Sequence, residues 1–331
     1  MYPIRKLDRN INHILQDIIS ADIEGNVNKG LHNQIFFIDE DDHISDVCEI
    51  VKNPIDGTCI VRLSEAFCQF FWFISDICLK EIDLSIIKDE CAKVSGTIEQ
   101  YKQEVETIIQ NPMRYFWLLL QQYPGLNPTQ YLDYLRCSMQ LLDAKQHTAN
   151  QQHEFQMAVS ILDKSQTIDL AAISKTNIDG LYEQKVNSVY CFGITFILLH
   201  ELSHFSLGHM DKLVAESEDE VDADLSAFWS IYSDINDARR FSANVGILCM
   251  MFTLLMLNPT MQEDGIHPRE DKRIFDIYEN IKDESPKYTV LLVRLFKIWA
   301  DVYGVADFPQ VYDDNEISLQ IIRNYLANKT F

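Results

Sequence analysis

The chain has 331 residues, of which 47% are hydrophobic, and this is enough for a folded protein with a substantial buried core. Its formal net charge of −22 argues against nucleic-acid binding, because phosphate contacts need clustered Lys and Arg, which are scattered here among acids. The eight cysteines form no CxxC pair and several lie in apolar runs, so we expect free thiols, a reducing compartment and a cytoplasmic protein.

The first third of the chain is expected to mix short strands with helix. The N-terminus is polar throughout and lacks the apolar core of a signal peptide. β-Branched and aromatic residues predict strands at Gln34–Ile38 and Thr58–Leu63. A helix that is aromatic on more than one face should follow from Ser64, and such a helix is expected to be buried.

The rest of the chain is expected to be helical. The Pro- and Gly-containing segment QQYPGLNPTQ is the clearest loop, with Asn127 as N-cap of the next helix. The most apolar stretches, Val189–Leu199 and Val245–Leu257, are shorter than the roughly 18 residues that span a bilayer, so we interpret them as buried helices and expect no membrane partner. The predicted helices are Glu99–Gln110, Pro128–Asp143, Glu154–Asp163, Leu181–Leu207, Glu218–Ser233, Arg239–Leu257, Arg269–Lys282, Tyr288–Tyr303 and Ile317–Leu326.

The most informative motif lies near the end of the helix predicted over Leu181–Leu207. Asp179 is its expected N-cap, and Gly208 its expected C′ residue. The helix is apolar on nearly all sides before it reaches the sequence HELSH at residues 200–204. The motif should therefore lie inside the protein.

The spacing within this motif is typical of a metal site. His200 and His204 are four residues apart, so both imidazoles lie on one helix face and can bind the same ion. Burying two histidines and a carboxylate is costly unless something satisfies them, and a zinc ion would do so. Glu201 is then placed to act as general base. The alternative is a buried helix whose two histidines only contribute to packing.

A catalytic zinc site needs a third protein ligand, for which there are two candidates. His209 is the first, but Leu207 and Met210 stand where the metzincin pattern has Gly and His. On a continued helix His209 would also face away from His204. We therefore interpret His209 as a structural residue, or as a neighbour of a ligand.

The second candidate lies in EDEVDADLSAFW, on the following predicted helix. Glu220 and Asp224 are four residues apart and share a face. We predict that Glu220 is the third ligand and that Asp224 accepts a hydrogen bond from a ligand imidazole. Glu216, Glu218 and Asp219 are expected to form a solvated acidic face.

A third element is the segment IHPREDKRIFDIYENI. His267 precedes Pro268, which can occupy the first turn of a helix, and Arg273 on that helix is well placed for a carboxylate partner. During peptide hydrolysis negative charge develops on the scissile carbonyl oxygen, and a donor beside the zinc lowers that barrier. His267 is the candidate for this catalytic role. The alternative is a turn residue without one.

Taken in order, these motifs resemble the Lit-type phage-exclusion peptidases of bacteria. The resemblance rests on HELSHFSLGH, EVDAD, GILCMMFTLLML and HPREDKRIFDIYENI, and on VRLSEAFCQFFWFISD upstream. It covers about residues 57–80 and 185–285, with no match between about 85 and 180. The arrangement is also similar to gluzincin peptidases of the membrane-protease type, without their transmembrane helices.

The resemblance implies a soluble zinc endopeptidase that acts in phage defence by abortive infection. Such a peptidase stays silent until a phage-derived activator is present, and then cuts the host elongation factor that delivers aminoacyl-tRNA. One departure is that Asp222, rather than Glu, is the first acid before Ala223. When the functional residues of the family are carried over position by position, one Zn²⁺ would be bound by His200, His204 and Glu220, with Glu201 as the base. Asp224 would contact a ligand, and His267 and Arg273 would line the site.

The expected fold is mainly α with a small N-terminal β element, a zincin-like metallopeptidase built on a buried HExxH helix. We expect a single domain over residues 1–331, with a mixed α/β part at 1–95 and a zinc-site helical core at 180–285. Two other functions stay open. One is a zinc peptidase that cleaves a repressor or antitoxin, and the other is a non-catalytic acidic interaction module with structural zinc or none.

Overall fold

The computed structural model describes residues 4–21, 31–39, 47–52, 55, 59–95, 129, 136, 140, 181–212, 216–258, 267–281, 286–312 and 314–329. Packing divides the chain into two compact units, Met1–Cys78 with Phe155–Phe331, and Leu79–Glu154. The helices predicted at Glu99–Gln110 and Glu154–Asp163, most of Pro128–Asp143, and the caps Asn127 and Asp179 lie outside the described residues. The single-domain assignment stays a prediction.

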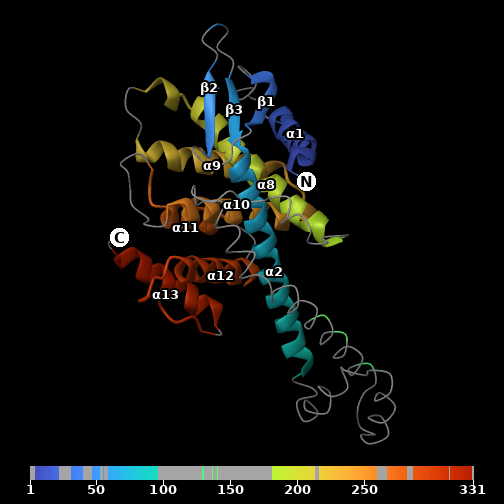
Figure 1. The fold of residues 1–331 in the computed structure, drawn as a ribbon, viewed down its shortest axis with the longest axis vertical. Helices are drawn as coiled ribbons and strands as arrows, with labels where there is room; N and C mark the ends of the chain where they lie inside the picture. Colours follow the sequence, from blue (N-terminus) through green and yellow to red (C-terminus); the bar gives the residue numbers. More distant parts are fainter. Residues whose placement is uncertain are drawn as a thin grey trace, which may run out of the picture. The chain divides into compact units, whose positions relative to one another are not determined.

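The first unit begins with an amphipathic helix that the sequence analysis did not predict. Helix α1 (Ile4–Ala21) buries apolar residues spaced three or four apart, among them Leu7, Ile11 and Leu15. This spacing places them on one helical face. That face packs against helix α8 (Leu181–Ser206) (Figure 1).

A small mixed sheet follows α1, with strand order β1-β3-β2. The predicted strands are β1 (Leu31–Asp39) and β3 (Cys59–Ser64), which pair in parallel. Strand β2 (Cys48–Lys52) pairs antiparallel with β3 and was not predicted, because five residues carry too little alternation to be recognised. Both β2 and β3 pack against α8.

The predicted aromatic helix is α2 (Glu65–Ser95), of which residues 79–95 belong to the second unit. It begins where expected, because the Ser64 hydroxyl accepts a hydrogen bond from the Phe67 amide at 3.1 Å, as an N-cap does. Its aromatic residues Phe67 and Phe71 are fully buried, and the Phe71 ring stacks on Tyr190 of α8.

The helices predicted in the last half of the chain are all present. They begin and end within a few residues of the expected positions; α11, for example, begins at Glu270, one residue after the expected Arg269. The structure is therefore mainly helical, as expected. These helices are α8, α9 (Ser217–Asp234), α10 (Asp237–Leu257), α11 (Glu270–Asn280), α12 (Pro286–Val302) and α13 (Asn315–Asn328).

Helix α8 is the centre of the first unit, with α1, α9, α10 and the sheet around it (Figure 1). It meets α10 at two glycines, where a Cβ on Gly246 would stand 2.5 Å from the Val189 carbonyl oxygen and 3.0 Å from the Gly193 amide. The two backbones therefore touch. This contact fixes the position of α8 two turns before the HELSH motif.

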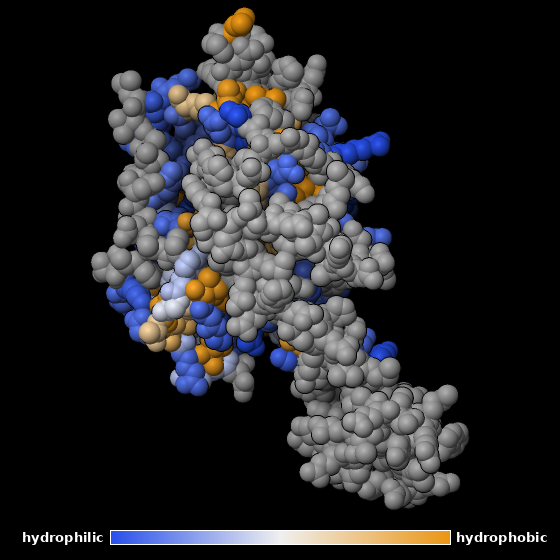
Figure 2. All heavy atoms as spheres, in the orientation of Figure 1, coloured by the Kyte–Doolittle hydropathy of each residue, from blue (hydrophilic) through white to orange (hydrophobic). Residues whose placement is uncertain are grey.

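Helices α8 and α10 are each long and apolar enough, by length and composition, to cross a membrane. The whole helices are thus longer than the apolar stretches recognised in the sequence. However, 83% of the α8 window and 72% of the α10 window are buried inside the protein, as in the core helices of folded domains. On the face shown in Figure 2, the described surface is mostly hydrophilic, with only small scattered apolar areas.

Candidate metal centre

The two histidines of the motif lie on the last turns of α8 and point to the same side. His200 is buried and His204 is partly buried, and their Nε2 atoms are 3.2 Å apart. The helix ends at Ser206, and Gly208 follows in the left-handed conformation with φ of 75°, which confirms its predicted place after the helix end. Ser203, between the histidines, contacts Ser226 of α9 through their hydroxyls at 2.9 Å.

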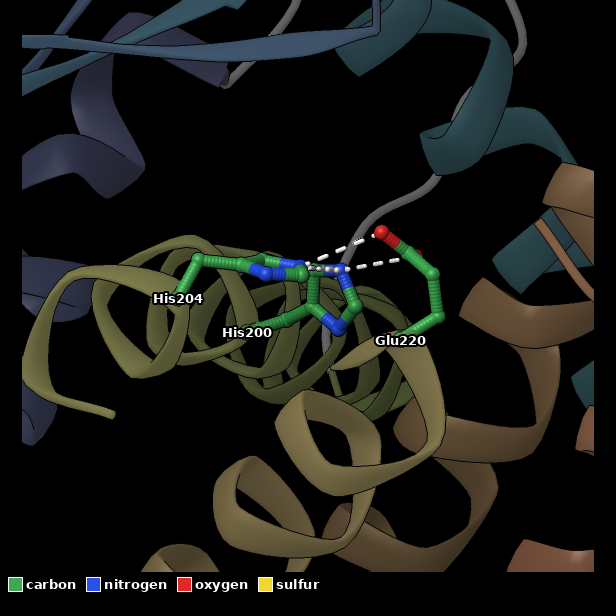
Figure 3. Close-up of side chains that lie close together, drawn as sticks. All are labelled: His200, His204 and Glu220. Atoms are coloured by element: carbon green, nitrogen blue, oxygen red, sulfur yellow. Dashed lines mark hydrogen bonds and ion pairs between the residues drawn. The ribbon is translucent and has the colours of Figure 1, made fainter. Parts of the chain in front are cut away.

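Helix α9 brings Glu220 to the two imidazoles, as predicted. Its Oε2 is 3.4 Å from His200 Nε2, and its Oε1 is 3.3 Å from His204 Nε2 (Figure 3). Asp222, which departs from the pattern of the Lit-type peptidases, is exposed. Buried Ala223, Ala227 and Phe228 anchor this segment of α9 to the core.

The atoms of these three side chains are close enough together to bind one metal ion. Ligand atoms that lie about 2.0–2.1 Å from a zinc ion at tetrahedral corners are roughly 3.3–3.4 Å from each other. The Nε2 atoms of His200 and His204 are 3.2 Å apart, and Glu220 contacts them with different oxygens, Oε2 at 3.4 Å and Oε1 at 3.3 Å. One ligand atom from each of the three residues lies within 4.8 Å of the others. Among the described residues, this buried His-His-Glu group could therefore hold a metal ion.

Asp224 lies one turn beyond Glu220 and contacts the other side of His200. Its Oδ1 is 2.9 Å from His200 Nδ1, although the ring N–H does not point directly at that oxygen. The Arg273 guanidinium, from α11, donates two hydrogen bonds to Asp224 at 2.6 and 2.8 Å and lies 3.6 Å from Glu220. The predicted carboxylate partner of Arg273 is thus Asp224.

The charges around the site favour a cation. Burial raises the pKa of Glu220, but hydrogen bonds from His200 and His204 outweigh it and leave the pKa well below its usual range. For Asp224 burial acts in the same way, and the Arg273 charge outweighs it and lowers the pKa to about 2. Burial lowers the pKa of His200, but its contact with Asp224 outweighs this and raises the pKa to about 9.

Glu201 lies on the same helix end and is partly buried. Burial raises the pKa of Glu201, and the nearby His200 and His204 oppose this effect. Burial raises the pKa of the Cys48 thiol in β2, and the negative charge of Glu201 raises it further. The strand that the sequence analysis missed therefore lies beside the predicted base.

His209 contacts His204, although the spacing on a continued helix would have turned it away. Because Gly208 ends the helix in the left-handed conformation, the chain turns and brings His209 Nδ1 to 3.1 Å from His204 Nδ1. The expectation of a solvated face was wrong for Asp219, which is buried, contacts Lys212 and lies 3.5 Å from His209 Nε2. Its carboxylate also caps α9 by accepting from the Glu216 amide.

His267 lies at the edge of the group. Its Nε2 is 3.8 Å from Glu220 Oε1, and its side chain is about half exposed. Of the seven predicted site residues, five are thus linked by contacts, namely His200, His204, Glu220, Asp224 and Arg273. Glu201 lies near them, and His267 borders solvent.

Comparison with protein families identifies the class of protein to which the chain belongs. Residues 111–292 match a family of peptidases, so the chain is a peptidase and therefore a hydrolase. That family is Peptidase U49, and the chain belongs to it. The match contains every predicted site residue, and it also includes residues 111–180, where the sequence showed no resemblance to the Lit-type peptidases. Comparisons with curated proteins and with solved structures found no match.

Proposed function

We propose that the chain is a zinc-dependent endopeptidase in which His200, His204 and Glu220 bind one zinc ion and Glu201 is the general base. The observation that carries this proposal is the convergence of His200, His204 and Glu220, whose ligand atoms lie within 4.8 Å of one another, next to Glu201 in a member of a peptidase family. A catalytic zinc site has three protein ligands and one open position, whereas a structural site has four. Among the residues that the structure describes, the group has three members, which supports catalysis over the interaction module.

The charge balance supports a divalent ion. With neutral imidazoles, Glu201, Glu220 and Asp224 carry three negative charges, and Arg273 carries one positive charge. The remaining two negative charges would be balanced by a divalent cation. Such buried charges are costly when they are not balanced, so a cation would stabilise the folded site.

The residues of the chain then have distinct tasks in peptide hydrolysis. A bound zinc ion would supply Lewis-acid polarisation of the scissile carbonyl and would make water more acidic. The Glu201 carboxylate takes a proton from the attacking water and returns it to the nitrogen of the leaving amine. Asp224 holds His200 in orientation through Nδ1, and Arg273 holds Asp224. The exposed imidazole of His267 donates to the carbonyl oxygen as negative charge develops.

The substrate and setting are proposed on the resemblance to the Lit-type gluzincin peptidases. A peptidase acts on protein, and the resemblance names the elongation factor that delivers aminoacyl-tRNA as the host substrate, cut in phage defence after a phage-derived activator appears. A cytoplasmic location agrees with the cysteines in the described part of the chain, because Cys48, Cys68, Cys78, Cys191 and Cys249 are all free thiols.

The test compares wild type with Glu201→Gln, which keeps the shape of the side chain but cannot take up a proton. Purified elongation factor is incubated with each protein in an extract of infected cells, and the fragments are identified by mass spectrometry. Metal content is measured on the same samples. We expect one zinc per chain in both proteins, and at least a 100-fold slower cleavage by the variant, since general-base catalysis contributes about 10²–10⁴-fold.

Glu218→Gln is the matched control, because Glu218 is exposed at the start of α9 and should leave cleavage unchanged. Cleavage by Glu201→Gln at the wild-type rate would remove the mechanism, and substoichiometric metal in the wild type would remove the zinc site. Fragments from a repressor or antitoxin instead of the elongation factor would leave the mechanism intact and replace the substrate.

A further inference from the structure

The second ligand histidine has a partner that the mechanism above does not use. His209 is the first residue of a short 3-10 helix, His209–Asp211, that follows the left-handed Gly208. Its Nδ1 is 3.1 Å from His204 Nδ1, and the two rings meet edge to face with their centroids 5.2 Å apart. The His209 side chain is only 8% exposed, so little of it contacts water.

The other ring nitrogen of His209, Nε2, also has a partner. It lies 3.5 Å from Asp219 Oδ1. Asp219 is itself fixed, because it contacts the Lys212 ammonium and accepts a hydrogen bond from the Glu216 amide at 3.1 Å. A continuous row of polar groups therefore leads from the His204 ring through His209 to a charged, anchored carboxylate.

The positions of the ring protons follow from this arrangement. His204 Nε2 faces His200 and Glu220, so a metal ion would use the lone pair of that nitrogen. The proton of the neutral His204 ring must then be on Nδ1, from which it is donated toward His209. His209 Nδ1 can accept only if its own proton is on Nε2, the nitrogen that faces Asp219.

We propose that His209 is a positioning residue that holds His204 in its metal-binding tautomer and orientation. This inference rests on the proposed zinc site. His209 would do for His204 what Asp224 does for His200 through the contact of 2.9 Å. A neutral imidazole is a weaker acceptor than a carboxylate, so its effect should lie near the lower end of the 10- to 100-fold changes in metal affinity typical of such partners.

The experiment measures zinc affinity of the full-length protein by competition with a chelator of known affinity. His209→Leu removes the acceptor, whereas His209→Asn keeps an acceptor oxygen on the same side-chain carbon that carries Nδ1. We expect about 10-fold weaker zinc binding for the Leu variant, and affinity close to wild type for the Asn variant. His13→Leu is the control, because His13 is an exposed histidine on α1 and its loss should leave zinc affinity unchanged.

Two further measurements separate positioning from a role in folding. The unfolding temperature of the metal-free Leu variant should equal that of the metal-free Asn variant. In a ¹⁵N NMR spectrum of the zinc-loaded wild type, His204 should be protonated on Nδ1 and His209 on Nε2. This measurement needs no substitution, so it decides the case even where the Leu variant does not fold.

The outcomes distinguish the two proposals. A wild type that binds no zinc would overturn the zinc site and this inference with it. Equal zinc affinity of wild type and the Leu variant, or a His209 proton on Nδ1, would overturn only the role of His209. Equal losses of affinity in the Leu and Asn variants, matched by equal losses of metal-free stability, would assign His209 to folding alone.

Discussion

Adding one methyl group at Gly246 tests the packing that holds the metal-binding helix. In an ordinary helix, Gly→Ala stabilises by about 1 kcal/mol, because alanine has the higher helix propensity. Gly246 lies on α10 where that helix touches α8, and its position is buried. The sign of the change in unfolding free energy therefore reports directly on the contact.

The magnitude follows from the space available. The new Cβ would stand 2.5 Å from the Val189 carbonyl oxygen, about 0.9 Å short of the 3.4 Å at which ordinary contact begins. It would also stand 3.0 Å from the Gly193 amide and 3.1 Å from the Phe192 Cβ. Because backbone atoms cannot rotate away, the helices must separate, and such overpacking costs about 3 kcal/mol, the upper part of the usual range. After the gain in propensity, Gly246→Ala should lose about 2 kcal/mol.

Thermal unfolding followed by circular dichroism measures this loss. With an unfolding entropy of about 2.1 cal/mol/K per residue, a loss of this size lowers the melting temperature of the chain by roughly 3 °C. Ser242→Ala is the matched control on the same helix, because it raises helix propensity without adding a Cβ, and it should leave the melting temperature unchanged or slightly raised. A Gly246→Ala variant as stable as wild type, or more stable, would refute the close approach of α8 and α10.

Two other substitutions test buried polar contacts. Arg273→Met leaves the buried Asp224 without its cation, so urea unfolding should show a loss of about 3–5 kcal/mol, and a loss below about 1 kcal/mol would contradict the buried pair. Arg269→Ala removes donors to the carbonyls of Leu326 at 2.8 Å and Lys329 at 3.2 Å, which end helix α13. Amide exchange should then be faster in the last turn of α13 and unchanged in α8. Unchanged exchange at both places would show that the Arg269 hydrogen bonds do not stabilise the end of α13.

Much of the local structure could be predicted from the sequence, because it depends on residues close together in the chain. A spacing of four residues predicted that His200 and His204 lie on one face of their helix, and the same spacing predicted that Glu220 and Asp224 share a face of theirs. The Ser64 cap was recognisable because its hydroxyl bonds to an amide three residues away. Helix α1 could also have been predicted, because its apolar residues recur every three or four positions among many polar ones.

Other features could not be read from local patterns. The five residues of β2 are defined by their partner β3, not by their own alternation. Asp219 looks like one of several surface acids, and its burial depends on Lys212 and on the turn that follows α8. The contact of His209 with His204 could not be predicted, because helical periodicity applies only as far as the helix continues and Gly208 ends it.

Local spacing along the chain is enough to place two imidazoles on one helix face beside a glutamate, and two acids on one face of a second helix. The packing of the helices is needed to bring Glu220 within 3.4 Å of both imidazoles and Arg273 of α11 into contact with Asp224. Periodicity within a helix is set by hydrogen bonds over four residues. The distance between two helices is instead set by side-chain packing, here by the contact of Gly193 with Gly246 and by the hydroxyl pair of Ser203 and Ser226.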